Sequence, residues 1–174
     1  FKGTIMAILI SPMIVPLIIT SAGMFFFYSK IGLTHTYLGL ILAHTALGTP
    51  FVVITVTATL TGFDTNLIRA SQSLGANTMR TFFKVIMPLI LPGVISGALF
   101  AFITSFDEVV VVMFIGSVEQ ITIPKQMWAG LRQETSPVIL CMATCLVFLS
   151  IALLTTVELL RRRSERLRGI KTQN

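Results

Sequence analysis

The stretch RASQSLGANTMRTFFKVIMPLILP (residues 69–92) decides the fold, because it is a basic, amphipathic segment set between long apolar runs. Its apolar side chains recur at helical spacing, and polar residues such as Arg80 and Lys84 fall on the opposite side. A helix of this kind lies on a membrane surface and presents its polar face to the aqueous phase. Gly75 suits a left-handed helix end and Asn77 can cap the next helix, so we expect two short helices here.

The composition indicates an integral membrane protein. Of the 174 residues, 54% are hydrophobic and 11% are charged, and the mean hydropathy is +0.88. Soluble domains carry about a quarter charged residues, which argues against a water-soluble protein. The net charge of +6 does not indicate nucleic-acid binding, because the basic residues form no stripe. Six of them gather in a tail after the last apolar run: Arg161, Arg162, Arg163, Arg166, Arg168 and Lys171.

Four apolar runs are long enough to cross a bilayer, which takes about 20 residues. They lie at about 4–27, 37–60, 89–114 and 137–159. Pro12 and Pro16 interrupt the first run, so we expect a kink there. Of the 13 Lys and Arg residues, ten fall on one side of these spans and three on the other. The positive-inside rule therefore predicts that both termini and the loop at residues 64–88 face the cytoplasm.

No catalytic or metal-binding pattern is recognisable. His35 and His44 lack metal-binding spacing, and Cys141 and Cys145 lack further ligands nearby. The sequence contains neither a nucleophile–base arrangement nor a glycine-rich phosphate loop that ends in Gly-Lys-Ser/Thr. We therefore predict a non-enzymatic chain that binds no cofactor and no metal. His44 is interpreted as a hydrogen-bonding residue between helices.

Asp107 and Glu108 are the carboxylates inside a predicted span. A charge at the bilayer centre costs on the order of 2.5 to 3.5 kcal/mol, so such a group normally faces a cavity or a partner. We predict that Asp107 faces a solute pathway. Glu108 shares a face with a stripe of small residues suited to helix packing, so we place it nearer a helix contact or the external mouth. That stripe consists of Gly93, Gly97, Ala101 and Ser105.

Two alternatives stay open for these polar groups. Asp107 and Glu108 can instead pair with Lys125 or Arg132, or lie in water at the membrane interface. Trp128, the single tryptophan, follows in the external segment. It is interpreted either as an interface anchor or as a residue that stacks on a ligand.

The basic loop resembles the cytoplasmic loop of ABC importer permeases. The signature of that family is Glu-Ala-Ala, three residues, Gly, nine residues, then Ile-x-Leu-Pro. With the same spacing, this chain has Arg69-Ala70-Ser71, Gly75 and Val85-Ile86-Met87-Pro88. Ala70, Gly75 and Pro88 are identical to the signature, whereas Arg69 replaces its carboxylate.

Two further stretches resemble the spermidine/putrescine branch of these permeases: LPGVISGALFAFITSFDEVVV (residues 91–111) and TIPKQMWAGLRQETSP (residues 122–137). The resemblance implies an all-α integral membrane protein with the MetI-like type I permease bundle. We expect one domain, 1–174, with about four transmembrane helices and a cytoplasmic coupling helix. The resemblance implies that these spans would be the last four of six. Because the chain begins at Phe1, we interpret it as N-terminally incomplete.

The resemblance also implies partners and roles. A cytoplasmic ATPase that uses ATP, a second permease subunit and an external solute-binding protein would assemble with this chain in the inner membrane of a bacterium. Asp64 would cap the coupling helix. The residues that would couple to the ATPase are Leu67, Ala70, Ser71, Leu74, Gly75 and Pro88. Those that would line the substrate pathway are Asp107, Glu108 and Trp128.

Other functions are kept as alternatives. One is an ABC permease for another small solute, such as an amino acid, iron or an opine. Another is a secondary transporter or channel, although such a protein would carry ionisable residues on several spans. A third is a membrane scaffold that only anchors a partner.

Overall fold

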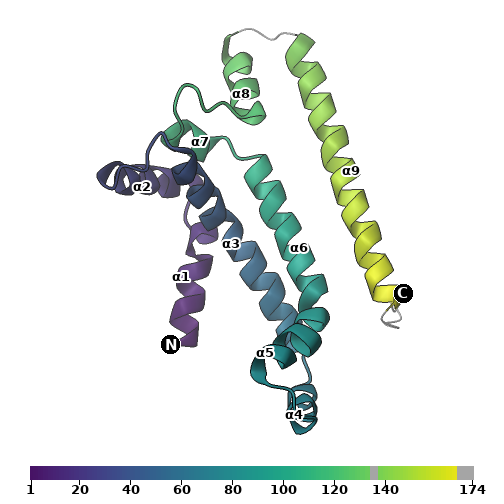
Figure 1. Ribbon diagram of the computed structural model, residues 1–174. Coiled ribbons are helices and arrows are strands. Elements are labelled where there is room, and N and C mark those ends of the chain that lie inside the picture. Colours follow the sequence, from purple (N-terminus) through teal and green to yellow (C-terminus); the bar gives the residue numbers. More distant parts are fainter. Residues whose placement is uncertain (134–136, 168–174) are drawn as a thin grey trace.

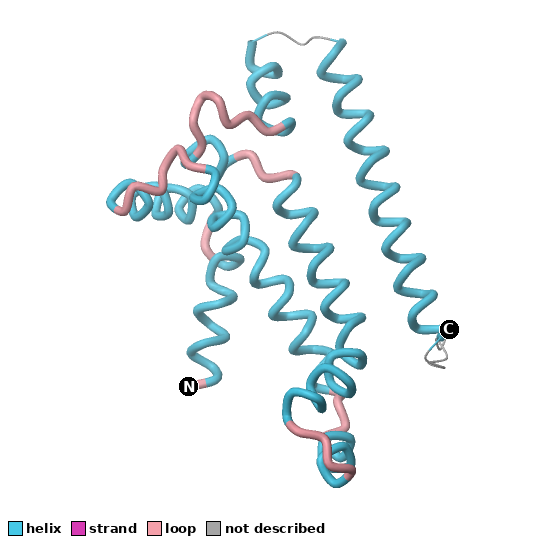
Figure 2. The backbone as a smooth tube through the Cα atoms, viewed as in Figure 1, coloured by secondary structure: helices cyan, strands magenta, loops and turns pink. Residues whose placement is uncertain are grey.

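The computed structural model describes residues 1–133 and 137–167, and every regular element in them is a helix (Figure 1 and Figure 2). The elements in chain order are α1 (Lys2–Ile14), α2 (Leu17–Lys30), α3 (Tyr37–Thr61), α4 (Asn66–Ser73), α5 (Thr78–Thr81), a π-helical turn (Phe82–Ile86), α6 (Met87–Phe106), α7 (Val110–Ile115), α8 (Ile123–Gln133) and α9 (Pro137–Leu167). The all-α class is confirmed.

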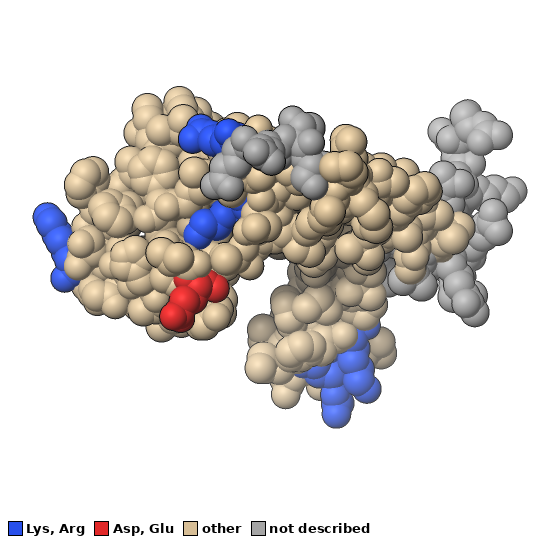
Figure 3. All heavy atoms as spheres, turned by 90° about the horizontal axis from the view of Figure 1, so that it is seen from above, with Lys and Arg blue, Asp and Glu red and all other residues tan. Residues whose placement is uncertain are grey.

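Three helical stretches are long and apolar enough to cross a membrane: Tyr37–Thr61, Thr78–Phe106 and Pro137–Thr156. The pair α1 and α2 is a fourth candidate, as a broken span. On the face seen in Figure 3, uncharged residues cover most of the described surface, and charged side chains are confined to small areas. The many large apolar side chains that stay exposed on the helices fit lipid or other apolar helices rather than water.

The first expected span, at about 4–27, is not one kinked helix. α1 and α2 are separated at Val15 and Pro16, and their axes differ by 109°. Val15 has an extended backbone, with φ −75° and ψ 136°, which is the conformation that a residue before proline prefers. In Figure 1, α2 accordingly lies across the direction of α1 and α3.

Pro12, by contrast, does not interrupt α1. A proline inside a helix leaves the carbonyl of the residue four positions earlier without its amide partner. That carbonyl is Ile8 O, and Ser11 Oγ donates a hydrogen bond to it at 2.8 Å. The serine hydroxyl therefore compensates locally, and of the two prolines expected to kink the span only Pro16 breaks it.

α3 and α6 lie side by side and pack along the predicted stripe of small residues (Figure 1). A Cβ added at Gly93 would collide with Thr59 Oγ1. A Cβ added at Gly97 would lie 2.7 Å from Val52 Cα, which is closer than real side chains approach. The backbones of α3 and α6 can therefore approach this closely because Gly93 and Gly97 carry no side chain.

The third span differs from the expected range of 89–114. One continuous stretch runs over Thr78–Phe106, so the span begins earlier, through the π-helical turn, and ends earlier. Asp107 ends it with φ −89° and ψ 0°. The Oε1 atom of Glu108 then accepts a hydrogen bond from Val111 N at 2.9 Å, and this side-chain cap starts α7 as a separate helix.

The best-packed region lies where α2, α3 and α7 meet. The buried cluster there consists of Tyr28, Leu40, Ala43, Leu47, Val111, Val112 and Ile115. The turn between α2 and α3 is fixed to it by His35, which has φ +61° and donates its backbone N–H to Ile115 O at 2.8 Å. The short helix α7 is thus part of the core, although it is too short to cross a membrane.

The fourth span is confirmed as a helix that begins at Pro137. α9 contacts α6 and α8, but none of its apolar window is buried inside the described chain. Of the basic tail, Arg168 and Lys171 lie outside the described residues.

Candidate functional site

The coupling loop, residues 64–88, lies at the opposite end of α3 and α6 from α7 (Figure 1). Asp64 Oδ1 accepts a hydrogen bond from the first backbone N–H of α4 at 2.9 Å. Gly75 has φ +79°, and Asn77 Oδ1 accepts from Arg80 N at 2.9 Å. These three local features are as predicted. The second expected short helix, however, is the beginning of the long stretch that continues as α6.

A hydrogen bond joins α4 to the base of this long stretch. Ser71 Oγ and Thr81 Oγ1 lie 2.9 Å apart, and Thr81 is only 2% exposed. Ala76 N also donates to Ser71 O at 3.1 Å across the turn. Ser71 is recognisable from the spacing of the loop, whereas Thr81 gives no sequence signal, because its partner is on another helix. Thr81 is therefore a residue of this site that sequence reasoning missed.

The outer surface of the coupling loop mixes exposed apolar side chains with polar and basic ones. Leu74, at the end of α4, is 89% exposed, and Leu67 is 42% exposed. Ala70 and Gly75 are also exposed, whereas Pro88 is half-buried just after the π-helical turn. Large apolar side chains exposed this far at the end of a helical bundle are typical of a protein contact.

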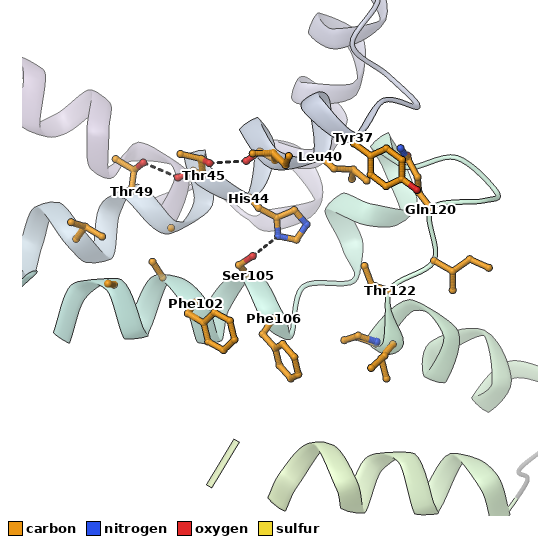
Figure 4. Close-up of a pocket in the computed structure, with 18 of the residues that line it drawn as sticks. Tyr37, Leu40, His44, Thr45, Thr49, Phe102, Ser105, Phe106, Gln120 and Thr122 are labelled. Carbon is orange, nitrogen blue, oxygen red and sulfur yellow. Dashed lines mark hydrogen bonds between the residues drawn. The ribbon is translucent and has the colours of Figure 1, made fainter. Parts of the chain in front are cut away.

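The larger cavity, of about 1000 Å³, opens between α3, α6 and the segment that connects α7 to α8 (Figure 4). Most of its wall is apolar. The polar residues along it are Tyr37, His44, Thr45, Thr49, Ser105, Glu119, Gln120 and Thr122. His44 Nδ1 and Ser105 Oγ lie 2.9 Å apart, so the interpretation of His44 as an interhelical hydrogen-bonding residue is confirmed.

The three side chains predicted for the substrate pathway are not brought together. Glu108 is 7% exposed and caps α7. Asp107 is exposed and lines a second, smaller cavity, of about 380 Å³, between α6, α8 and α9. Trp128 is 45% exposed on α8, and the guanidinium of Arg132 lies 5.4 Å from the centroid of its ring. None of the three lines the larger cavity.

The helix face that Glu108 was predicted to share with the stripe of small residues is absent, because α6 ends at Phe106. Lys125, the suggested partner of these carboxylates, bonds elsewhere. Its Nζ donates to Ser117 O at 3.0 Å and to Gln120 O at 3.2 Å. The open alternative of an ion pair with Lys125 is therefore wrong.

Glu119 is the carboxylate that does line the larger cavity, and no pattern in the sequence singles it out. It lies in an irregular loop outside the apolar runs, where a lone acidic residue is most simply a solvated one. Its position depends on how α7 and α8 turn the chain back over α3. No periodic pattern encodes that turn.

The chain matches the family model described as "Binding-protein-dependent transport system inner membrane component" over residues 1–167. It is 30% identical over 163 residues to the spermidine/putrescine transport system permease protein PotC of Haemophilus influenzae, which covers 94% of this chain and 63% of that protein. It is 28% identical over 145 residues to the putrescine transport system permease protein PotI of Escherichia coli K12, which covers 79% of this chain and 51% of that protein. The chain thus spans less than two thirds of the length of these curated relatives.

The structure is similar to an inward-facing MetNI methionine ABC transporter, with a TM-score of 0.73 and 22% sequence identity over 93% of this chain and 73% of that chain. At this identity the similarity concerns the fold alone, and it confirms the expected permease-type helical bundle. The family model accounts for nearly the whole sequence. The chain therefore belongs to the family of inner membrane components of binding-protein-dependent transport systems.

Proposed function

We propose that the chain is part of a permease subunit of an ATP-driven importer, and that the importer carries polyamines across the bacterial inner membrane. The family supports the transport role. Two relatives, a spermidine/putrescine permease protein and a putrescine permease protein, support the choice of cargo. The same resemblance supports three partners: a cytoplasmic ATPase, a second permease subunit and an external solute-binding protein.

The main observation in support of this proposal is the contact between α4 and the long helical stretch over Thr78–Phe106. α4 offers exposed Leu74 to a partner, and the hydrogen bond between Ser71 and Thr81 ties it to the base of that stretch. Because a packed helix moves largely as one body, a displacement of α4 is passed on to α6 and to the cavity beside it. Such an element transmits a displacement of α4 to the membrane helices and needs no catalytic group of its own.

In this proposal the coupling loop faces the cytoplasm and the α7–α8 region faces outward. The distribution of Lys and Arg supports this orientation. ATP is bound and hydrolysed by the separate ATPase, and this chain supplies the path. A secondary transporter would have no use for an exposed amphipathic helix that is hydrogen-bonded to the base of its longest span.

The test is a change of Leu74 to glutamate in the full-length permease, expressed with its natural partner subunits. A carboxylate buried in an apolar contact without a partner costs several kcal/mol, so we expect the ATPase to co-purify at least about tenfold less. Val118→Glu is the matched control, because Val118 is also 89% exposed but lies at the other end of the molecule. Equal recovery of the ATPase with both variants would contradict the proposed coupling.

A further inference from the structure

The wall of the larger cavity combines an apolar surface with a single acidic group. Among the described residues that line it, Glu119 is the one acidic side chain, and neither Lys nor Arg is present. A linear aliphatic polyamine has cationic amines separated by methylene chains. Its methylenes match the apolar wall, and an ammonium group matches a carboxylate through a charge-assisted hydrogen bond.

Glu119 stands on a turn that the chain itself braces. Ser117 N donates to Gln120 Oε1 at 2.9 Å, and Gln120 is only 6% exposed. Lys125 Nζ holds the same turn by donating to Ser117 O and Gln120 O. A group on a backbone that is already fixed loses less freedom when it binds a ligand. The turn therefore presents the carboxylate in a preorganised position.

The carboxylate of Glu119 is also uncommitted. Lys125, in the first turn of α8, donates its ammonium to the two carbonyl groups of this turn. In the ranges that the structure describes, the Glu119 side chain makes no hydrogen bond or ion pair. Glu108 differs, because its oxygen accepts from Val111 N. Because Glu119 is the one Asp, Glu, Lys or Arg among the described residues that line the cavity, its carboxylate attracts a cationic solute to that wall.

We propose that Glu119 binds an ammonium group of a linear aliphatic polyamine in the larger cavity. Tyr37 lines the same cavity and offers an aromatic face to the cation (Figure 4). This inference rests on the proposed function, since it assigns the larger cavity to the route of the solute. It moves the cation-binding role from Asp107 to a residue outside the predicted spans.

The test measures polyamine uptake by the full-length permease, assembled with its partners in vesicles, as a function of spermidine concentration. For Glu119→Gln we expect the KM to rise about tenfold at nearly unchanged maximal rate, because a hydrogen bond to a charged group is lost. Glu119→Asp keeps the charge and is expected to fall between this variant and the wild type. Val118→Ala is the control for the turn, because Val118 does not line the cavity.

An unchanged KM in Glu119→Gln would overturn the inference. In that case a raised KM in Asp107→Asn would place the cation at the smaller cavity instead. The proposed function fails separately, if the wild-type assembly shows neither spermidine uptake nor spermidine-stimulated ATP hydrolysis.

If Val118→Ala also lowers uptake, a disturbed turn could explain the effect of Glu119→Gln, and chemical modification separates the two causes. Glu119→Cys, in a background without Cys141 and Cys145, is treated with methanethiosulfonate reagents that attach either a sulfonate or a quaternary ammonium group. We expect the anionic adduct to restore at least about half of the uptake and the cationic adduct to abolish it. The same uptake with both adducts would overturn the inference whatever the state of the turn.

Discussion

Glu108 keeps a carboxylate inside an apolar region because the backbone gives it a partner. Its Oε1 accepts from Val111 N at 2.9 Å, and Val111 itself is fully buried in the core. From the sequence, Glu108 is expected nearer a helix contact or the external mouth. Its buried position before α7 agrees with a helix contact, and its pathway role stays a prediction. The proposed pathway role of Asp107, which has no such bond and lies at the smaller cavity, stays a prediction.

We expect Glu108→Ala to lower the free energy of unfolding by about 1 to 3 kcal/mol, because it leaves a buried backbone N–H without an acceptor. Glu108→Gln keeps a carbonyl oxygen at the same place and should cost less than half as much. Thermal unfolding in detergent, followed by circular dichroism, measures the difference. Asp107→Ala is the control, since this exposed side chain caps nothing in the described chain. Similar losses of unfolding free energy in Glu108→Ala and Glu108→Gln would show that the charge of Glu108, rather than its hydrogen bond to Val111, stabilises the protein.

At the scale of elements, the predictions that agree with the structure are those that depend on residues close together in the sequence. The αL position of Gly75, the cap at Asn77 and the start of α9 at Pro137 depend on neighbouring residues, and all three agree with the structure. The predicted C-terminal end of the third span was wrong because hydropathy does not register a cap such as that of Glu108. The break at Pro16 was expected as a kink, but its 109° depends on how α2 packs against α7.

Because α3 and α6 pack so closely, we expect one added methyl group to lower the free energy of unfolding. Gly97→Ala would place a Cβ 2.7 Å from Val52 Cα, so the helices must separate. Overpacking of this kind costs about 1 to 3 kcal/mol, and the same unfolding measurement should detect it. Gly23→Ala is the matched control, because a Cβ on this glycine of α2 meets nothing within 4 Å. If the two variants were equally stable, the close approach of α3 and α6 would not depend on the stripe.

At the scale of the whole molecule, the coupling loop lies at one end of the α3–α6 pair (Figure 1), and the larger cavity reaches the other end, at Tyr37 of α3 and Phe106 of α6. The helix, the turn and the caps of the coupling loop could be predicted, because they follow one another in the chain. The cavity could not, because its wall joins residues of α3 and α6 to a loop near Glu119 that is remote from α3 in sequence. Hydropathy places helices in a membrane but does not pair them.

The orientation is testable with single cysteines in a background without Cys141 and Cys145. We expect a membrane-impermeant maleimide to label Val118→Cys in spheroplasts and to label Arg80→Cys only after the membrane is opened, with at least a tenfold difference between the sites. The reason is the excess of basic residues on the side of the coupling loop. Labelling of Arg80→Cys from outside would place the coupling loop beyond the reach of a cytoplasmic ATPase.

α9 has a consequence for how the protein is made. Its window over Pro137–Thr156 has a mean hydropathy of 2.6, and none of it is buried inside the chain. A segment this apolar partitions into lipid without help from neighbours, whereas α1 and α2, with 13 and 14 residues, are each too short to cross a bilayer alone. During biosynthesis α9 would therefore leave the translocon as an independent unit. It would find its place beside α6 afterwards, by lateral diffusion in the bilayer.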